Sequence, residues 1–168
     1  HRGSSLRVID DYTNLTRVML DRGNTEGARR ITQELRRDQR GNPQGELRFV
    51  HVAGTNGKGT TSTFTANILT EAGYKTGLFT SPYVSNFLER IQIDGKTVSE
   101  ESFAEAVTEV KSAVEQTDDQ PTEFEVITAA ALICYKNEKC DIVVLEVGLG
   151  GRFDATNIID TPLVGVIA

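Results

Sequence analysis

A glycine-rich segment that directly follows a short run of strand-forming residues has the composition of a phosphate-binding loop. It spans residues 54–60 and reads Gly-Thr-Asn-Gly-Lys-Gly-Thr. Glycines let several backbone N–H groups turn toward one anion, and the N-terminus of a following helix adds unpaired donors. Lys58 would bring a cation to the β- and γ-phosphates, and the hydroxyl of Thr60 or Thr61 could bind Mg²⁺. The segment predicts a nucleoside-triphosphate site, and the competing interpretation is a glycine-rich turn with an exposed lysine.

The loop departs from the general P-loop pattern at two positions. That pattern has a glycine where this chain has Val52, and a serine or threonine where this chain has Gly59. The phosphate-loop interpretation therefore depends on context, namely a strand before the loop and a helix after it.

A carboxylate at the end of another apolar strand is the second candidate. Glu146 lies in the run 142–147, and a buried carboxylate is costly unless it is paired or bound to a metal. Beside a phosphate loop, such a residue suits Mg²⁺ held against ATP. Ser81, which follows a shorter strand, offers another hard oxygen. The alternative for Glu146 is a salt bridge with Arg90 or Arg152.

Other candidates are weaker. Glycines cluster at 148–151, but a dinucleotide-binding fingerprint would need glycine at the position of Phe153. His51 lies inside a strand, where a packed or hydrogen-bonded core histidine is more common than a catalytic one. Phe124 and Phe153 could stack on a planar ligand, but burial in the core is the favoured interpretation of both.

The elements that position these residues alternate between strands and helices. A continuous apolar run is typical of a central parallel strand, and Asp94-Gly95 is a strong hairpin signal within 91–98. The alternation predicts an α/β fold with a mostly parallel sheet flanked by helices, and it brings the candidate loops together at the carboxyl ends of the strands. The expected strands are 47–52, 76–80, 142–147 and 163–167, and the expected helices are 60–72, 99–115 and 123–139, with one or two more within 6–39.

Apolar spacing assigns the buried faces of two of these helices. In the first helix after the phosphate loop, Phe64, Ile68 and Leu69 share one face. In the helix 99–115, apolar residues recur at i, i+4, i+7 and i+11 from Phe103. We expect these faces to lie in the core.

Composition excludes several classes of protein. A length of 168 residues fits one domain. The chain has 24 acidic and 18 basic residues, and this net charge of −6 disfavours nucleic-acid binding by bulk charge. It has no apolar run long enough for a membrane span and no signal peptide, so we expect a cytoplasmic protein. Cys134 and Cys140 are too few for a disulfide framework and are expected to be reduced thiols.

Together these residues resemble the folylpolyglutamate and dihydrofolate synthases of the Mur ligase superfamily. The segment 51–60 closely resembles the phosphate loop of that family, whose own form is G-K-G-T. Further matching segments agree in order and spacing across nearly all of 25–168. They are Gly41-Asn42-Pro43-Gln44, Thr80-Ser81-Pro82 with Glu89-Arg90-Ile91, Thr122-Glu123-Phe124-Glu125, and residues 145–152 with Asp154-Ala155-Thr156-Asn157.

The resemblance implies a P-loop NTPase-like Mur ligase central domain with ATP and Mg²⁺ as cofactors. Lys58 and Glu146 would be the catalytic residues. The ATP triphosphate would be held by Thr55, Asn56, Gly57, Lys58, Gly59 and Thr60, and Mg²⁺ by Thr60, Ser81 and Glu146. A pterin would contact Thr122, Glu123, Phe124, Glu125, Phe153, Asp154 and Ala155. A family Gly-Leu-Glu-Arg segment that also reaches the pterin matches Gly27-Ala28-Arg29-Arg30, in which Gly27 and Arg30 are kept and the middle is changed.

The implied reaction is ATP-driven amide formation. A carboxylate of dihydropteroate or of a folate such as tetrahydrofolate attacks the γ-phosphate, and the amino group of L-glutamate then attacks the acyl phosphate. Lys58 and Mg²⁺ would stabilise charge on the transferring phosphoryl group. The pterin-site match favours a bifunctional enzyme that makes dihydrofolate and also extends the polyglutamate tail. It would act as a monomer, without nucleic-acid or membrane partners.

Members of that family are more than twice as long as this chain. We therefore expect an N-terminal helical segment at 1–45 that packs on an incomplete, truncated ATPase domain at 46–168, with the C-terminal ligase domain absent from this chain. On this interpretation the 168 residues are inactive alone. The alternatives are a P-loop phosphotransferase or NTPase of another class, a non-catalytic nucleotide-binding module, and a Mur-type cell-wall ligase.

Overall fold

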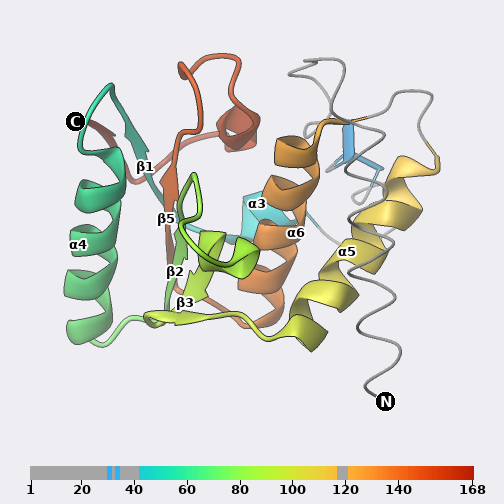
Figure 1. Cartoon of the computed structure of the whole chain (residues 1–168), viewed down its shortest axis with the longest axis horizontal. Helices are drawn as coiled ribbons and strands as arrows, with labels where there is room; N and C mark the ends of the chain where they lie inside the picture. Colours follow the sequence, from blue (N-terminus) through green and yellow to red (C-terminus); the bar gives the residue numbers. More distant parts are fainter. Residues whose placement is uncertain (1–29, 32, 35–41, 117–120) are drawn as a thin grey trace.

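A six-stranded sheet lies between helix α4 (Lys58–Glu71) on one face and helices α5 (Glu100–Val114) and α6 (Glu123–Asn137) on the other (Figure 1). The computed structural model describes residues 30, 31, 33, 34, 42–116 and 121–168. The layered arrangement confirms the predicted α/β fold. The helices expected within 6–39 lie almost wholly outside the described residues. In the described ranges, no helix combines the length and apolar content that crossing a membrane requires.

The strands are arranged in the order β4-β3-β2-β5-β1-β6. Strands β2, β5, β1 and β6 run parallel, whereas β3 and β4 extend the β2 side as antiparallel strands. The carboxyl ends of β2, β5 and β1 therefore lie side by side at one edge of the sheet. The strand bounds are β1 (Phe49–Ala53), β2 (Thr76–Phe79), β3 (Ile91–Ile93), β4 (Lys96–Thr97), β5 (Ile142–Glu146) and β6 (Val164–Ile167).

The predicted strands, and the three helices predicted after the phosphate loop, all form within two residues of their expected bounds. The hairpin is also confirmed, because Asp94 and Gly95 between β3 and β4 both have positive φ, as a type I′ turn requires. Pro43 begins the one-turn helix α3 (Pro43–Glu46), since proline suits the first helical position. Residues 42–116 and 121–168 also contain the 3-10 helices η1 (Phe87–Arg90) and η2 (Ala155–Ile158).

Alternation along the strands divides the core into two clusters. Ile142 and Val144 of β5 pack on the α4 side with Val50 and Val52 of β1. The intervening β5 residues lie in the larger cluster that α5 and α6 cover. Because successive side chains point to opposite faces, Glu146 falls on the α4 face.

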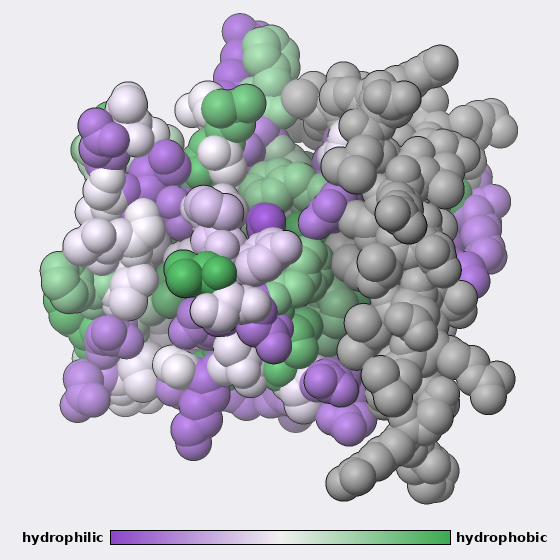
Figure 2. All heavy atoms as spheres, viewed as in Figure 1, coloured by the Kyte–Doolittle hydropathy of each residue, from purple (hydrophilic) through white to green (hydrophobic). Residues whose placement is uncertain are grey.

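Helix α4 contradicts the predicted buried face. Phe64 and Ile68 are 65% and 68% exposed, and Figure 2 shows apolar surface along the outer edge of this helix. The side chains that face the sheet are smaller, namely Ser62 and Ala66, with Leu69 packed beside them. Small residues let the helix axis approach the strands closely, so side-chain size decides this face instead of hydrophobicity.

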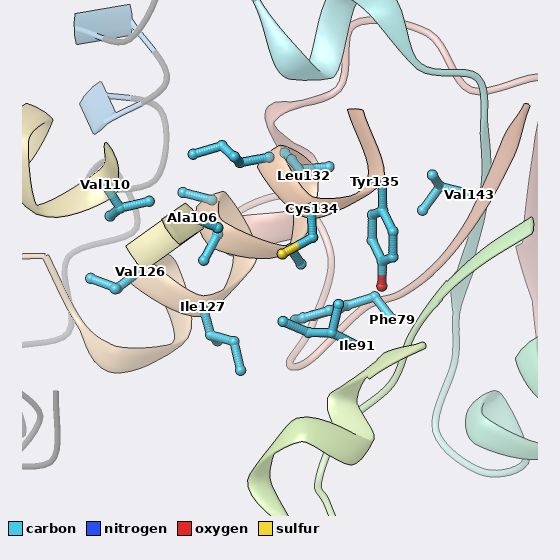
Figure 3. Packing of buried hydrophobic residues seen from close by; sticks show 14 of the residues in the cluster. Phe79, Ile91, Ala106, Val110, Val126, Ile127, Leu132, Cys134, Tyr135 and Val143 are labelled. Carbon is cyan, nitrogen blue, oxygen red and sulfur yellow. The ribbon is translucent and has the colours of Figure 1, made fainter. Parts of the chain in front are cut away.

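The opposite layer follows its predicted pattern. In α5, Phe103, Val107 and Val110 are buried, and the Ser99 side chain caps the helix by accepting from the Ser102 N–H. Figure 3 shows this core, including Tyr135 of α6, whose hydroxyl donates to a β2 carbonyl at 2.7 Å. Both cysteines are free and buried, in agreement with the predicted reduced thiols, and burial raises the pKa of each thiol to about 12, which favours the protonated form.

Gly77 of β2 is expected to tolerate no side chain. A Cβ at this position would lie 2.7 Å from Cδ1 of the Tyr135 ring, which is fully buried. We expect Gly77→Ala to lower the free energy of unfolding by about 1–3 kcal/mol, as over-packing does elsewhere. Urea unfolding measures this loss, with Gly165→Ala in β6 as the matched control because open space surrounds that glycine. Equal losses in both variants would contradict the packing interpretation.

Candidate nucleotide and substrate site

The predicted phosphate loop joins β1 to α4 at the carboxyl edge of the sheet. Gly57 is the N-cap of α4 and has φ 80°, a left-handed conformation that glycine adopts without strain. No side chain caps this helix, so its first-turn N–H groups are left for an anion. Lys58 Nζ donates to the Gly54 carbonyl at 3.1 Å, which keeps the ammonium over the loop. The context required for a phosphate loop, strand before and helix after, is confirmed.

Glu146 is buried at the end of β5, where three segments meet. Its Oε2 accepts a hydrogen bond from the Ser81 N–H at 3.1 Å, and a Cβ on Gly59 would lie 3.7 and 3.8 Å from its two carboxylate oxygens. Burial raises the pKa of Glu146, while the Ser81 N–H and the Lys58 ammonium lower it in part. Burial thus leaves the negative charge incompletely compensated, and such a carboxylate attracts a cation.

Neither arginine that was considered as an ion-pair partner reaches this carboxylate. Within the described residues, the Arg90 guanidinium lies over the rings of Tyr83 and Phe87, and that of Arg152 lies over Phe153. The salt-bridge alternative for Glu146 is therefore not supported, and the interpretation as a metal carboxylate is strengthened.

The residues at this edge fit a Mg²⁺ ion. Hard oxygen ligands are available from the Glu146 carboxylate and the Ser81 hydroxyl, on neighbouring strand ends. Gly59 carries no side chain toward the Glu146 carboxylate, so the first turn of α4 leaves the space beside this carboxylate open. Thr60, the third predicted ligand, is exposed in that turn, and the described contacts do not join its side chain to Ser81 or Glu146.

A second group of predicted residues surrounds Gly148, which follows Glu146 by two positions. A Cβ on Gly148 would lie 2.5 Å from Phe124 Cζ and 3.1 Å from Asp154 Oδ2, so only glycine lets the ring and the carboxylate approach each other. Phe124 also packs on Phe79, with ring centroids 5.8 Å apart, which confirms its predicted place against the core. Asp154 is buried and caps η2. An aromatic ring and an acceptor therefore lie together beside the metal candidate.

The segment 122–125 has a local structural role that the sequence analysis did not identify. Thr122 and Glu125 form a capping box, in which the Thr122 side chain accepts from the Glu125 N–H and the Glu125 side chain accepts from the Thr122 N–H. This reciprocal cap begins α6 and fixes the intervening Phe124. The spacing Thr-x-x-Glu before an apolar helix is the signal that could have revealed it.

The other predicted substrate residues differ in their surroundings. Phe153 is 69% exposed, so the interpretation as a core residue was wrong for this ring: it lies in the segment 148–154 between β5 and η2 and belongs to neither core cluster. Ala155 is buried in η2, and Glu123 is half-buried in the first turn of α6. Arg30 is exposed, and Gly27 lies outside the described residues.

His51 is hydrogen-bonded as predicted, but its partner comes from a distant part of the chain. Its Nε2 lies 2.9 Å from Thr156 Oγ1, whose hydroxyl lies 2.6 Å from Asp154 Oδ1. Residues 51 and 156 are 105 positions apart, so no local pattern could indicate this contact. It ties η2, and the segment 148–154 before it, to β1.

The pKa of His51 should make stability depend on pH. Burial lowers this pKa below its ordinary value, and Asp154 opposes the shift only in part. Below about pH 6.5 the unfolded chain takes up a proton that the folded chain resists, so the free energy of unfolding should fall as the pH falls. We expect His51→Gln to flatten this slope in denaturant titrations between about pH 5 and 7. Identical slopes in the two proteins would contradict the buried neutral state.

Known proteins are similar to this chain in sequence and in fold, although no family model matches the chain. The chain is 48% identical over 132 residues to dihydrofolate synthase/folylpolyglutamate synthase of Bacillus subtilis, covering 76% of this chain and 30% of that protein. The structure of Mycobacterium tuberculosis folylpolyglutamate synthase complexed with ADP gives a TM-score of 0.84 at 31% identity, covering 97% of this chain and 37% of that one. Escherichia coli FolC in complex with DHPP and ADP gives a TM-score of 0.79 at 35% identity, covering 95% and 37%.

The sheet order, the phosphate loop before α4 and the likeness to solved synthase structures define the chain as an α/β domain of the Mur ligase fold. Over the part of their length that it spans, the chain is a homologue of the folylpolyglutamate and dihydrofolate synthases, which confirms the resemblance seen in the sequence. The chain spans about 30% of the length of the curated relative from Bacillus.

Proposed function

We propose that the protein carrying this chain is an ATP-dependent ligase that adds L-glutamate to dihydropteroate, to folates, or to both. The observation that carries the proposal is that the phosphate loop, Ser81 and Glu146 meet at the carboxyl ends of neighbouring strands, beside Phe124 and Asp154. The relative named dihydrofolate synthase/folylpolyglutamate synthase and the FolC structure with DHPP and ADP support the same assignment.

The residues of the phosphate loop have distinct roles in this proposal. The first-turn N–H groups of α4, the loop backbone at Thr55–Gly57 and the Lys58 ammonium bind the triphosphate of ATP. Glu146, Ser81 and Thr60 hold Mg²⁺, which when bound supplies charge neutralisation at the phosphoryl group. The substrate carboxylate attacks the γ-phosphorus and ADP leaves. The amino group of L-glutamate then attacks the acyl carbon, loses a proton and displaces phosphate.

The pterin would stack on Phe124 and donate an N–H to Asp154. Contacts from Thr122, Glu123, Glu125, Phe153, Ala155, Gly27 and Arg30 are part of the proposal. So is a segment 1–45 packed on an ATPase domain at 46–168, for which Ile31 gives support because it is 1% exposed in the same cluster as Phe49. The remaining elements of the proposal are a further ligase domain, a monomeric state and a cytoplasmic location.

ADP release tests the proposal. In the complete enzyme we expect release to require ATP, L-glutamate and either dihydropteroate or tetrahydrofolate. A phosphotransferase or simple NTPase would release ADP without glutamate, and that result would reject the ligase assignment. The 168-residue chain alone is expected to bind Mg-ATP without folate-dependent turnover. Such turnover by the purified chain would contradict its assignment as a partial ATPase domain.

A further inference from the structure

A chain of side-chain hydrogen bonds runs from the sheet to the Asp154 carboxylate. His51 lies in β1 and is paired by register with Leu145 of β5 and Gly165 of β6, so its backbone is held by a strand on each side. Its Nε2 contacts Thr156 Oγ1 at 2.9 Å, and that hydroxyl contacts Asp154 Oδ1 at 2.6 Å. The segment 148–154 is thereby joined to β1 through side chains.

The direction of these hydrogen bonds follows from the donors available. An ionised Asp154 can only accept, so the single hydroxyl proton of Thr156 is donated to Oδ1. Thr156 Oγ1 must then accept from His51, which places a proton on the histidine Nε2. Both the neutral histidine in this tautomer and the protonated form preserve the chain.

These contacts leave one oxygen of Asp154 with spare accepting capacity. Oδ1 accepts from both the N–H and the hydroxyl of Thr156, which uses its two lone pairs. Oδ2 accepts from the Leu149 N–H at 2.7 Å and retains one lone pair. This oxygen lies near the Phe124 ring, because both approach the vacant Cβ position of Gly148.

We infer that His51 and Thr156 are positioning residues that hold the Asp154 carboxylate with one lone pair directed to an N–H of a planar heterocyclic substrate. The inference rests on the proposed function, since it concerns the substrate of the same site. Rotation of the carboxylate would move the acceptor and break the hydrogen bond that the Leu149 N–H donates to it. Fixing the carboxylate to β1 gives the loop the precision of the sheet.

Steady-state kinetics of the complete enzyme test this inference. We expect Thr156→Val to raise the KM for dihydropteroate or tetrahydrofolate about tenfold or more while kcat changes little, because an acceptor is lost from its position. His51→Phe should act in the same direction. Thr156→Ser retains the hydroxyl and should restore the KM. The matched control is Thr76→Val, which removes a buried threonine hydroxyl bonded to a backbone carbonyl before β2.

The affinity for Mg-ATP, measured by calorimetry, separates positioning from general damage. We expect it to remain unchanged in the Thr156 variants, since the side-chain contacts of Thr156 lead to His51 and Asp154 and not to residues 54–60. An unaltered KM in Thr156→Val, or equal losses in the Val and Ser variants, would overturn the inference even if the wild-type enzyme is an active ligase. Wild-type enzyme that releases no ADP with any pterin substrate would instead reject the proposed function, and the inference with it.

Discussion

Replacing Lys58 with alanine is expected to weaken Mg-ATP binding by about 10- to 150-fold, which corresponds to ~1.5–3 kcal/mol for a hydrogen bond to a charged group. The ammonium lies over the phosphate loop, where its nearest partner is a loop carbonyl at 3.1 Å. A triphosphate offers a far stronger acceptor, so the lysine should exchange the carbonyl for phosphate oxygens. Calorimetric titration of Mg-ATP into the 168-residue chain measures the loss directly.

The control for this experiment is Lys96→Ala. It removes an exposed lysine from the edge strand β4, which three strands separate from β1 and the phosphate loop. It should bind Mg-ATP as the wild type does. If Lys58→Ala bound Mg-ATP with wild-type affinity, the lysine would not reach the phosphates. If the folded wild-type chain bound no Mg-ATP, the site would need residues from outside this chain.

The substitution Glu146→Gln is expected to abolish the dependence of nucleotide binding on Mg²⁺. The amide keeps the size of the side chain but lacks the charge that would hold the ion, so affinity in Mg²⁺ should fall at least about tenfold. Without Mg²⁺ the variant should bind ATP no more weakly than wild type, because a negative charge near the triphosphate is gone. Parallel titrations with Mg²⁺ and with a chelator show both effects, and Glu105→Gln on the exposed side of α5 is the control.

The same variant should alter stability in the absence of metal. Because burial raises the pKa of Glu146, the folded chain takes up a proton more readily than the unfolded chain. The free energy of unfolding of wild type should therefore decrease as the pH rises above about 4.5, and Glu146→Gln should lack this component. A Gln variant that is less stable than wild type at pH 7 would show that the carboxylate is fully compensated without an ion.

The sequence contained enough information to predict the layers of the fold but not the order of the strands within the sheet. The apolar run 142–147 and the Asp94-Gly95 turn acted locally, so both were predicted correctly. The placement of β5 between β2 and β1 depends on crossovers that no local pattern encodes. The predicted buried face of α4 was wrong because close packing on the sheet places the small residues Ser62 and Ala66 there instead of larger side chains.

The candidate site shows the same division. The phosphate loop and Glu146 stand out by residue type. The structure brings them together because β1, which precedes the loop, pairs with β5, which ends at Glu146. The closeness of Phe124 to Asp154 depends on the missing side chain of Gly148, which spacing alone does not reveal. The His51–Thr156 contact joins segments that are remote in sequence, and only the folded sheet makes them neighbours.

Side chains along β5 alternate between the two faces of the sheet, so the number of residues in the strand decides which face each one occupies. Ile142, Val144 and Glu146 share one face, so the carboxylate reaches α4 only because its position differs from those of its apolar partners by two or four residues. Insertion or deletion of a single residue in this strand would point the carboxylate into the apolar core under α5 and α6. It would also shift the following segment 148–154 by one position. Substitutions within the strand preserve that alternation, so length here should be far less variable than residue identity.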